Sequence, residues 1–407
     1  MSDALSAYKG VRDFYPEDER VRKYVMNAMR AVAESFGYEA YDASVLESTE
    51  LYTIKSNAEM VAEETYTFTD RGDRSVTMRP EMTPTVARMV AARKRELGYP
   101  ARWYSIPNLF RYDRPQRGRY REHWQLNADI FGVSDIAADE EILVLADTVL
   151  KSFGAKATMY EIRINDRNLL RESVEGALKD ASKYHDAVRL IDKKDKLKPE
   201  EFAKLWDELA TVSLDECLKE SDAINALIQR LHARGVTSAT FSPTIARGFD
   251  YYTGMVFEVF DTSGENASSI TGGGRYDNLV ELYGSEPVPC VGFGMGVERV
   301  QLFLETHNLI PTLDSSTQLY LAPIGAVATV QQVADTIRAT GINVALGMKH
   351  EKVGDHIKAA SKLGIPYFAA YGEDEEKSGT LTIKKLADGT EHKVALSDVA
   401  SALVINP

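Results

Sequence analysis

The sequence is poor in cysteine, in long apolar runs and in net positive charge, and each shortage excludes a class of protein. Its two cysteines, Cys217 and Cys290, stand alone without metal-ligand spacing, so they provide no disulfide framework and suit a reducing compartment. No apolar run approaches the ~20 residues that a membrane-spanning helix needs. The first ten residues lack the charged and apolar blocks of a secretory signal, so the sequence predicts a cytoplasmic protein with no membrane segment.

The chain is acidic overall but contains one strongly basic segment. Its net charge of −13 argues against broad, non-specific binding to nucleic acid, because phosphates are repelled at long range. Residues 102–121, however, hold six arginines and no lysine against a single acid, Asp113, with aromatic residues between them. A solvated charged face is the ordinary interpretation of such a run. Arginine suits bidentate contacts with phosphate and stacking on flat rings, so we favour a phosphate site.

A chain of 407 residues is long enough for two or three domains with a well-buried core. Its first 165 residues predict a mixture of helices and strands. Apolar residues with helical spacing over 20–38 predict a helix that ends near Gly37. The segments that follow predict a strand at 38–49, a hairpin at 65–81, a helix at 80–97, two strands between 104 and 125, a helix at 137–153 and a strand at 160–166.

The composition changes farther along the chain and divides it into segments. Residues 166–236 are charged, helix-prone and poor in glycine, which predicts a small helical insertion. Strand-like, glycine-rich sequence resumes over 237–308 and ends in a buried strand that runs into a helix. Proline, aspartate and consecutive Ser/Thr residues in 309–317 predict a linker. Strands and helices alternate over 318–407, which predicts a small α/β domain.

The stretch FRYDRPQRGRYREHWQLNADIFG carries the first group of candidate binding residues. Arg111 and Arg119 flank a loop, so both could reach one phosphate group from two strands. Gln125, Asn127 and Asp129 alternate in sequence, which would place them on one face of a strand. A carboxylate and an amide on an inward face suit an ammonium group or an imidazole. The same pattern also fits the polar, solvent-facing side of a sheet.

Two glycine-rich stretches and one strand-like stretch with polar residues are further candidate binding segments. GGGRYDN at 272–278 marks either a turn or a close approach of the backbone to a ligand. GFGMGVERV at 292–300 alternates glycines that would leave one strand face bare for a flat ring, and Arg299 follows in the next helix turn. Neither stretch matches a P-loop or a dinucleotide fingerprint. In ARGFDYYTGMVFEVFD, Arg247 and Tyr252 sit in an apolar, strand-like run, where they face solvent or line a pocket for a small charged ligand.

Taken together, these motifs resemble those of histidyl-tRNA synthetases, a family of class II aminoacyl-tRNA synthetases. The resemblance begins at KGVRDFYPED and runs to the end of the chain; FRYDRPQRGRYRE resembles motif 2 and GFGMGVERV resembles motif 3. RGFDYYTGMVFE and GGGRYDNL resemble the more specific histidine signatures. The resemblance implies an α+β catalytic domain with a mixed, mainly antiparallel sheet, formed by residues 1–165 and 237–308. It also implies a helical insertion at 166–236, a linker at 309–317 and an α/β anticodon-binding domain at 318–407.

The resemblance also implies roles for individual residues. The catalytic residues would be Arg111, Arg247 and Arg299. The histidine site would consist of Glu81, Thr83, Gln125, Asp129, Arg247, Tyr252 and Tyr276, in which Asp129 and Tyr252 would read the imidazole. The residues that bind ATP would be Arg111, Arg119, Glu122 and Arg299. The acceptor end of the tRNA would meet Arg114, Gln116 and Arg117.

The activity implied by the resemblance is activation of L-histidine with ATP to histidyl-adenylate, followed by transfer to the 3′ end of histidine tRNA. Mg²⁺ would accompany ATP, with no other cofactor and no metal site made of protein ligands, and the enzyme would be a homodimer. Three positions depart from the commoner pattern: Ser44 at the motif 1 proline, Asp113 in motif 2 and Asp129 as the acid that reads imidazole. The alternative is a non-catalytic, histidine-binding regulatory subunit of ATP phosphoribosyltransferase, which shares the fold but typically lacks the anticodon-binding domain.

Overall fold

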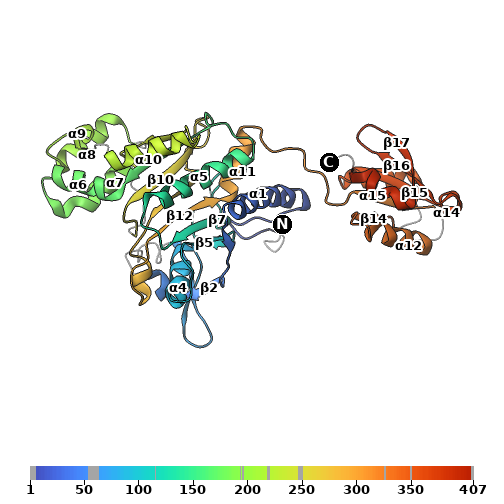
Figure 1. Cartoon of the computed structure of the whole chain (residues 1–407), viewed down its shortest axis with the longest axis horizontal. Coiled ribbons are helices and arrows are strands. Elements are labelled where there is room, and N and C mark those ends of the chain that lie inside the picture. Colours follow the sequence, from blue (N-terminus) through green and yellow to red (C-terminus); the bar gives the residue numbers. More distant parts are fainter. Residues whose placement is uncertain are drawn as a thin grey trace. The chain divides into compact units, whose positions relative to one another are not determined.

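The chain folds into two compact units, Met1–Ile310 and Pro311–Pro407 (Figure 1). The computed structural model describes residues 6–53, 64–114, 116–192, 194, 197–217, 221–245, 251–324, 327–348 and 351–404. Within these ranges, none of the helices has the length and apolar character required to cross a membrane.

A nine-stranded sheet forms the centre of the first unit. Its order is β1-β5-β7-β12-β11-β10-β8-β9, with β6 paired to β7. The pairs from β5 through to β8 in this order are antiparallel, and only the outer pairs β1–β5 and β8–β9 are parallel, which confirms the predicted mixed sheet. The strands are β1 (Glu39–Ala40), β5 (Ala101–Ser105), β6 (Asn108–Phe110), β7 (Glu122–Phe131), β8 (Tyr160–Asp166), β9 (Ala239–Phe241), β10 (Met255–Asp261), β11 (Thr271–Arg275) and β12 (Cys290–Gly296).

The helices that pack on this sheet around the largest hydrophobic cluster include α1 (Pro16–Ser35), α5 (Ile136–Ser152) and α11 (Val297–Thr306). Helix α1 begins four residues before the predicted start, because Pro16 suits the first helical position and the three acids that follow it favour the positive end of the helix dipole. It ends just before Gly37, whose φ of +79° is readily available only to glycine. Buried side chains such as Met29 and Phe303 join the helices to the sheet.

A small sheet in the order β2-β4-β3 adjoins α2 (Glu50–Thr53) and α4 (Thr83–Arg93). Its strands β3 (Tyr66–Thr69) and β4 (Ser75–Met78) form the predicted hairpin, and β2 (Leu46–Ser48) pairs with β4. The single strand predicted at 38–49 is wrong, because the chain leaves the large sheet after β1 and enters the small one at β2. Helix α4 ends before the predicted end, since the Lys-Arg-Glu run after Arg93 has no apolar side chain to bury.

The predicted helical segment consists of α6 (Arg167–Ala177), α7 (Tyr184–Asp192), α8 (Pro199–Leu209), α9 (Leu214–Cys217) and α10 (Asp222–Ala233). Helices α6 to α9 share a separate hydrophobic cluster that contains the fully buried Trp206. Helix α10 packs differently, because its Leu227 and Leu231 belong to the main hydrophobic cluster of the first unit. The insertion as a packing unit therefore runs from α6 to α9.

The second unit is an α/β domain, as predicted. Its five-stranded sheet has the order β14-β13-β15-β16-β17, parallel among the first three strands and antiparallel among the rest. The strands are β13 (Leu319–Pro323), β14 (Val344–Leu346), β15 (Tyr367–Tyr371), β16 (Thr380–Lys385) and β17 (Glu391–Ala395). The helices are α12 (Val327–Arg338), α13 (Val353–Lys362), α14 (Glu373–Ser378) and α15 (Val399–Val404).

Candidate active site

Strands β7 and β12 form the floor of a cavity of about 210 Å³. Gln125, Asn127 and Asp129 all line it, so the predicted shared face is confirmed. The solvent-facing alternative is wrong, because Asn127 is 6% and Asp129 is 4% exposed. The antiparallel register places Gly292 opposite Asp129, and a Cβ at Gly292 would meet the Asp129 carboxylate. The glycines of β12 therefore make room for these side chains, in addition to lining the cavity themselves.

The walls of this cavity come from four other segments of the chain, one of which carries Arg111. Glu81 and Thr83 lie at the start of α4, while Tyr251 and Tyr252 precede β10. The Tyr251 hydroxyl donates to Glu81 Oε2 at 3.2 Å. Tyr276, just after β11, completes the set. We call this space the acidic cavity, because its charged walls include the carboxylates of Glu81 and Asp129.

The structure brings together the described residues that the sequence assigned to histidine binding: Glu81, Thr83, Gln125, Asp129, Tyr252 and Tyr276. Arg247 lies outside the described residues, so its role stays a prediction. The strand expected over residues 246–261 begins only at Met255, and Tyr251 and Tyr252 precede it as non-strand backbone.

Asp129 and Tyr276 form a buried pair in the acidic cavity, in which the Tyr276 hydroxyl donates to Asp129 Oδ1. Burial raises the pKa of Asp129 to about 7, and the hydrogen bond from Tyr276 acts in the opposite direction. Burial and the neighbouring Asp129 raise the pKa of Tyr276 well above its ordinary value. The phenol therefore remains a hydrogen-bond donor, and the carboxylate is the member of the pair that titrates near neutral pH.

A second cavity of about 200 Å³ has three guanidinium groups in its lining, those of Arg111, Arg119 and Arg299. We call it the arginine cavity. Arg119 donates two hydrogen bonds to the carboxylate of Asp113, at 2.7 and 2.9 Å. Arg111 donates through Nε to the carbonyl oxygen of Pro80 at 2.9 Å. Three arginines against two acids, Asp113 and Glu298, leave this cavity with an excess of positive charge that attracts a polyanion.

Arg299 is the least neutralised of these cations. In the described part of the chain, no hydrogen bond or salt bridge joins its guanidinium to another residue. Burial lowers the pKa of Arg299, and the nearby Arg119 lowers it further. A phosphate group between the two arginines would relieve this repulsion, because it adds negative charge beyond that of Asp113, whose carboxylate is already paired with Arg119.

Arg111 and Gln125 line both cavities, so the two spaces meet at these side chains. Glu122, which the sequence assigned to ATP, is absent from the described lining of either cavity; its Oε1 accepts a hydrogen bond from Asn108 Nδ2 at 2.9 Å. Side chains alternate along β7, so Glu122 points away from the face that carries Gln125.

Sequence reasoning missed His123, although the alternation along β7 places it in phase with Gln125. It lines the arginine cavity, where burial and then Arg111 lower the pKa of His123 to about 3. Asp113 opposes this shift, and Arg119 and Arg299 add smaller lowering effects. His123 is therefore neutral at working pH and adds no charge to the cavity.

Arg12 and Glu298 were also missed as contributors to the arginine cavity. Glu298 lines this cavity. Its carboxylate accepts a hydrogen bond from Nη2 of Arg12 at 3.2 Å and another from the backbone N–H of Trp124 at 3.2 Å. The Arg12 guanidinium also lies 4.3 Å from the ring centre of Tyr120, another lining residue. The only signal for Arg12 was its place in the KGVRDFYPED stretch, which gave no role.

The loop between β6 and β7 carries the residues assigned to the tRNA acceptor end, and Arg114, Gln116 and Arg117 are exposed on it. Gln116 and Arg119 pair through both backbone groups, at 3.1 and 2.9 Å, so Arg117 occupies the tip of a tight turn. Gly118 follows with a φ of +69°, a conformation that this turn requires. Across the residues that the structure describes, no cluster of three or more His, Cys, Asp or Glu side chains is arranged to hold a metal ion.

Comparison with known proteins gives a consistent result. A family model described as histidyl-tRNA synthetase matches residues 10–211 and 198–300, and an anticodon binding domain model matches 318–405. The histidine–tRNA ligase of Leptospira biflexa is 41% identical over 416 residues, which cover 96% of this chain and 95% of that protein. The one from Thermoplasma volcanium is 36% identical over 428 residues, or 98% of each chain. The crystal structure of histidyl-tRNA synthetase from Nostoc sp. PCC 7120 shares the fold, with a TM-score of 0.80 at 22% identity over 98% of this chain and 99% of that one.

Proposed function

Because this chain belongs to the histidyl-tRNA synthetase family, we propose that its two cavities bind L-histidine and ATP side by side and join them at Arg111. Ligation of histidine to tRNA at the expense of ATP is the activity of the chain. The observation that carries the proposal is that Arg111 and Gln125 line both cavities. The carboxylate of one substrate and the α-phosphate of the other can therefore meet at a fixed guanidinium.

The acidic cavity is suited to histidine. Glu81 carries a carboxylate, and Gln125 and Thr83 carry neutral polar groups, which together match the ammonium end of an amino acid. The imidazole would lie toward Asp129, where a buried acceptor pairs with a ring N–H. Amino acids without that group would leave the buried carboxylate unpaired, at a large cost in binding free energy.

The arginine cavity is suited to the triphosphate of MgATP. Arg119 is already oriented by Asp113, and Arg299 stands beside it without a counter-ion of its own among the described residues. Arg111 would contact the α-phosphate, because it is the arginine that the two cavities share. Mg²⁺ belongs to this proposal as part of the nucleotide substrate.

In the first step, a carboxylate oxygen of histidine attacks the α-phosphorus, an O–P bond forms and the bond to pyrophosphate breaks. Negative charge accumulates on the phosphoryl oxygens and on the leaving pyrophosphate, and fixed guanidinium groups stabilise it without reorganising. In the second step, a 3′-terminal ribose hydroxyl of the tRNA attacks the carbonyl carbon and AMP leaves. Arg247 is proposed to assist the first step on the strength of the motif resemblance alone.

The proposal includes contact of Arg114, Gln116 and Arg117 with the acceptor end of the tRNA, which their exposure on the loop supports. It also includes a cytoplasmic homodimer. Exposed apolar side chains on the small sheet, Leu46 and Phe68, line a hollow there and support a partner surface. A purely regulatory role is less supported, because the second unit matches an anticodon binding domain model.

The test is histidine-dependent exchange of pyrophosphate into ATP. Wild-type protein is expected to exchange only when histidine is present. Arg111→Ala is expected to lower kcat by about two to three orders of magnitude, the usual loss for a fixed donor at a developing negative charge. Arg163→Ala is the matched control, because Arg163 pairs with Glu161 outside both cavities. Folded wild-type protein that binds histidine but does not exchange would overturn the proposal.

A further inference from the structure

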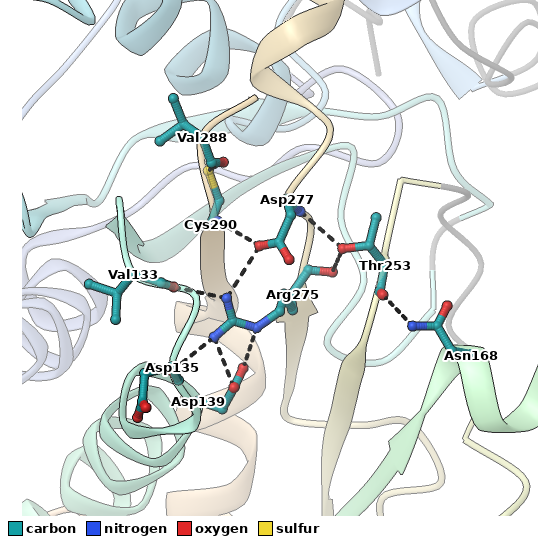
Figure 2. Close-up of polar contacts among 9 residues, drawn as sticks. All are labelled: Val133, Asp135, Asp139, Asn168, Thr253, Arg275, Asp277, Val288 and Cys290. Atoms are coloured by element: carbon teal, nitrogen blue, oxygen red, sulfur yellow. Dashed lines mark hydrogen bonds and ion pairs between the residues drawn. The ribbon is translucent and has the colours of Figure 1, made fainter. Parts of the chain in front are cut away.

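Arg275 is the centre of a buried hydrogen-bond network (Figure 2). Its Nε and Nη2 donate to both carboxylate oxygens of Asp139, at 3.0 and 2.8 Å. Its Nη1 donates to the carbonyl oxygen of Val133 at 2.9 Å and to Oδ1 of Asp277 at 3.2 Å. The same Oδ1 accepts the backbone N–H of Cys290 at 2.9 Å. The network therefore fixes β11 and the start of β12 against the first turn of α5.

Thr253 connects this network to the walls of the acidic cavity. Its backbone N–H donates to the carbonyl oxygen of Arg275 at 2.7 Å, and its Oγ1 accepts the backbone N–H of Asp277 at 3.0 Å. Thr253 directly follows Tyr252, and Asp277 directly follows Tyr276. Since both tyrosines line the acidic cavity, the bonds of Thr253 set the distance between two of its walls.

The insertion reaches the same threonine through the side chain of Asn168. Asn168 is the second residue of α6, and its Nδ2 donates to the carbonyl oxygen of Thr253 at 2.8 Å, as Figure 2 shows. The backbone N–H of Arg167 donates to the carbonyl oxygen of Gly254 at 2.9 Å. Asp166 caps the helix by accepting the backbone N–H of Asn168 at 2.8 Å. The first turn of the insertion is thus attached to the residue that follows Tyr252.

We propose that Asn168 is a positioning residue, through which the helical insertion holds Thr253 and Tyr252 in the geometry that binds histidine. The inference rests on the proposed function and deepens it, since it makes the insertion part of amino-acid recognition. Asn168 is exposed, and an exposed neutral hydrogen bond contributes little to global stability. Its loss acts locally, on the backbone next to Tyr252.

Two substitutions separate positioning from a merely structural role. Asn168→Ala removes the donor. Asn168→Asp keeps the shape but places a carboxylate against the Thr253 carbonyl, while an acid in the first turn of α6 favours the helix through its dipole. Asn168→Asp is therefore expected to preserve the thermal stability of the protein and still weaken histidine binding.

The experiment is histidine-dependent ATP–pyrophosphate exchange with each substrate varied in turn. Both Asn168 variants are expected to raise KM for histidine roughly three- to tenfold, the effect of one lost hydrogen bond, with KM for ATP and kcat unchanged. Asn343→Ala is the matched control, because Asn343 is an exposed asparagine whose Nδ2 also donates to a backbone carbonyl, that of Ser316, at 2.8 Å.

Two different failures are distinguishable. Wild-type exchange with an unchanged KM for histidine in both Asn168 variants would overturn the positioning role and leave the proposed function standing. An equal rise in KM for ATP would also overturn it, because the bond lies on the histidine side. Absence of exchange in the wild-type protein would instead overturn the proposed function.

Discussion

The hydroxyl of Tyr276 donates a hydrogen bond to Oδ1 of Asp129 in the acidic cavity. Asp129 loses most of its hydration there, so its pKa rises to about 7, and the bond from Tyr276 limits the rise. A carboxyl group with a raised pKa is ionised only above that pKa. Imidazole recognition by a carboxylate is therefore lost as the pH falls through this range.

The first prediction follows from the direction of that shift. Tyr276→Phe removes the bond that favours the ionised form, so the pKa of Asp129 rises further and the acid limb of kcat/KM for histidine moves to higher pH. Tyr160→Phe is the matched control, because Tyr160 is a buried tyrosine that donates to Asp147 at 2.6 Å outside both cavities. A pH profile of pyrophosphate exchange for each variant measures the shift. An acid limb that stays in place or moves to lower pH in Tyr276→Phe would contradict this assignment.

The second prediction concerns the glycines of β12. A Cβ at Gly294 would fall on the side-chain amide of Gln125, which lines both cavities. Gly294→Ala is expected to displace that amide and to lower kcat/KM for histidine about tenfold or more. Gly176→Ala, at an exposed helix position with open space around it, is the control and should leave exchange unchanged. Equal kinetics for the two variants would show that Gln125 is free to move aside.

The third prediction concerns Arg12, which supports the arginine cavity from the N-terminal segment. It pairs with Glu298 and stacks on Tyr120, both of which line the cavity. Arg12→Ala should loosen these two walls and raise KM for ATP about three- to tenfold, with little change in KM for histidine. The control is Arg171→Ala, since Arg171 makes a similar pair with Glu175 and stacks on Tyr184 in the insertion. A rise in KM for histidine, with KM for ATP unchanged, would show that Arg12 supports histidine binding and would contradict the prediction.

Local periodicity in the sequence was sufficient to predict one face of the site, but not the residues that hold that site in place. Alternation along β7 identifies Gln125, Asn127 and Asp129, and applied consistently it would also have selected His123 and rejected Glu122. Arg275 and Asp139, by contrast, are 136 positions apart, and Arg12 and Glu298 are 286 apart. Their pairing depends on how β11, α5 and α11 pack, which no short-range pattern encodes.

The fourth prediction tests how much the Arg275 network stabilises the first unit. Arg275 and Asp139 are both more than nine-tenths buried as side chains. Arg275→Met leaves the Asp139 carboxylate buried without its partner, at an expected cost of about 3–5 kcal/mol in the free energy of unfolding. Arg102→Met is the control, because Arg102 and Glu141 are 30% and 22% exposed and their pair is worth about 1 kcal/mol or less.

The measurement is urea unfolding followed by tryptophan fluorescence. All three tryptophans, Trp103, Trp124 and Trp206, lie in the first unit, so the signal is insensitive to unfolding of the second. The expected result is a much larger fall in the unfolding midpoint for Arg275→Met than for Arg102→Met. Similar falls would mean that water or a shift in the pKa of Asp139 relieves the lone carboxylate. In that case the rigidity between Thr253 and Tyr276 would have to come from the backbone ladder of β10 and β11, and not from the buried ion pair.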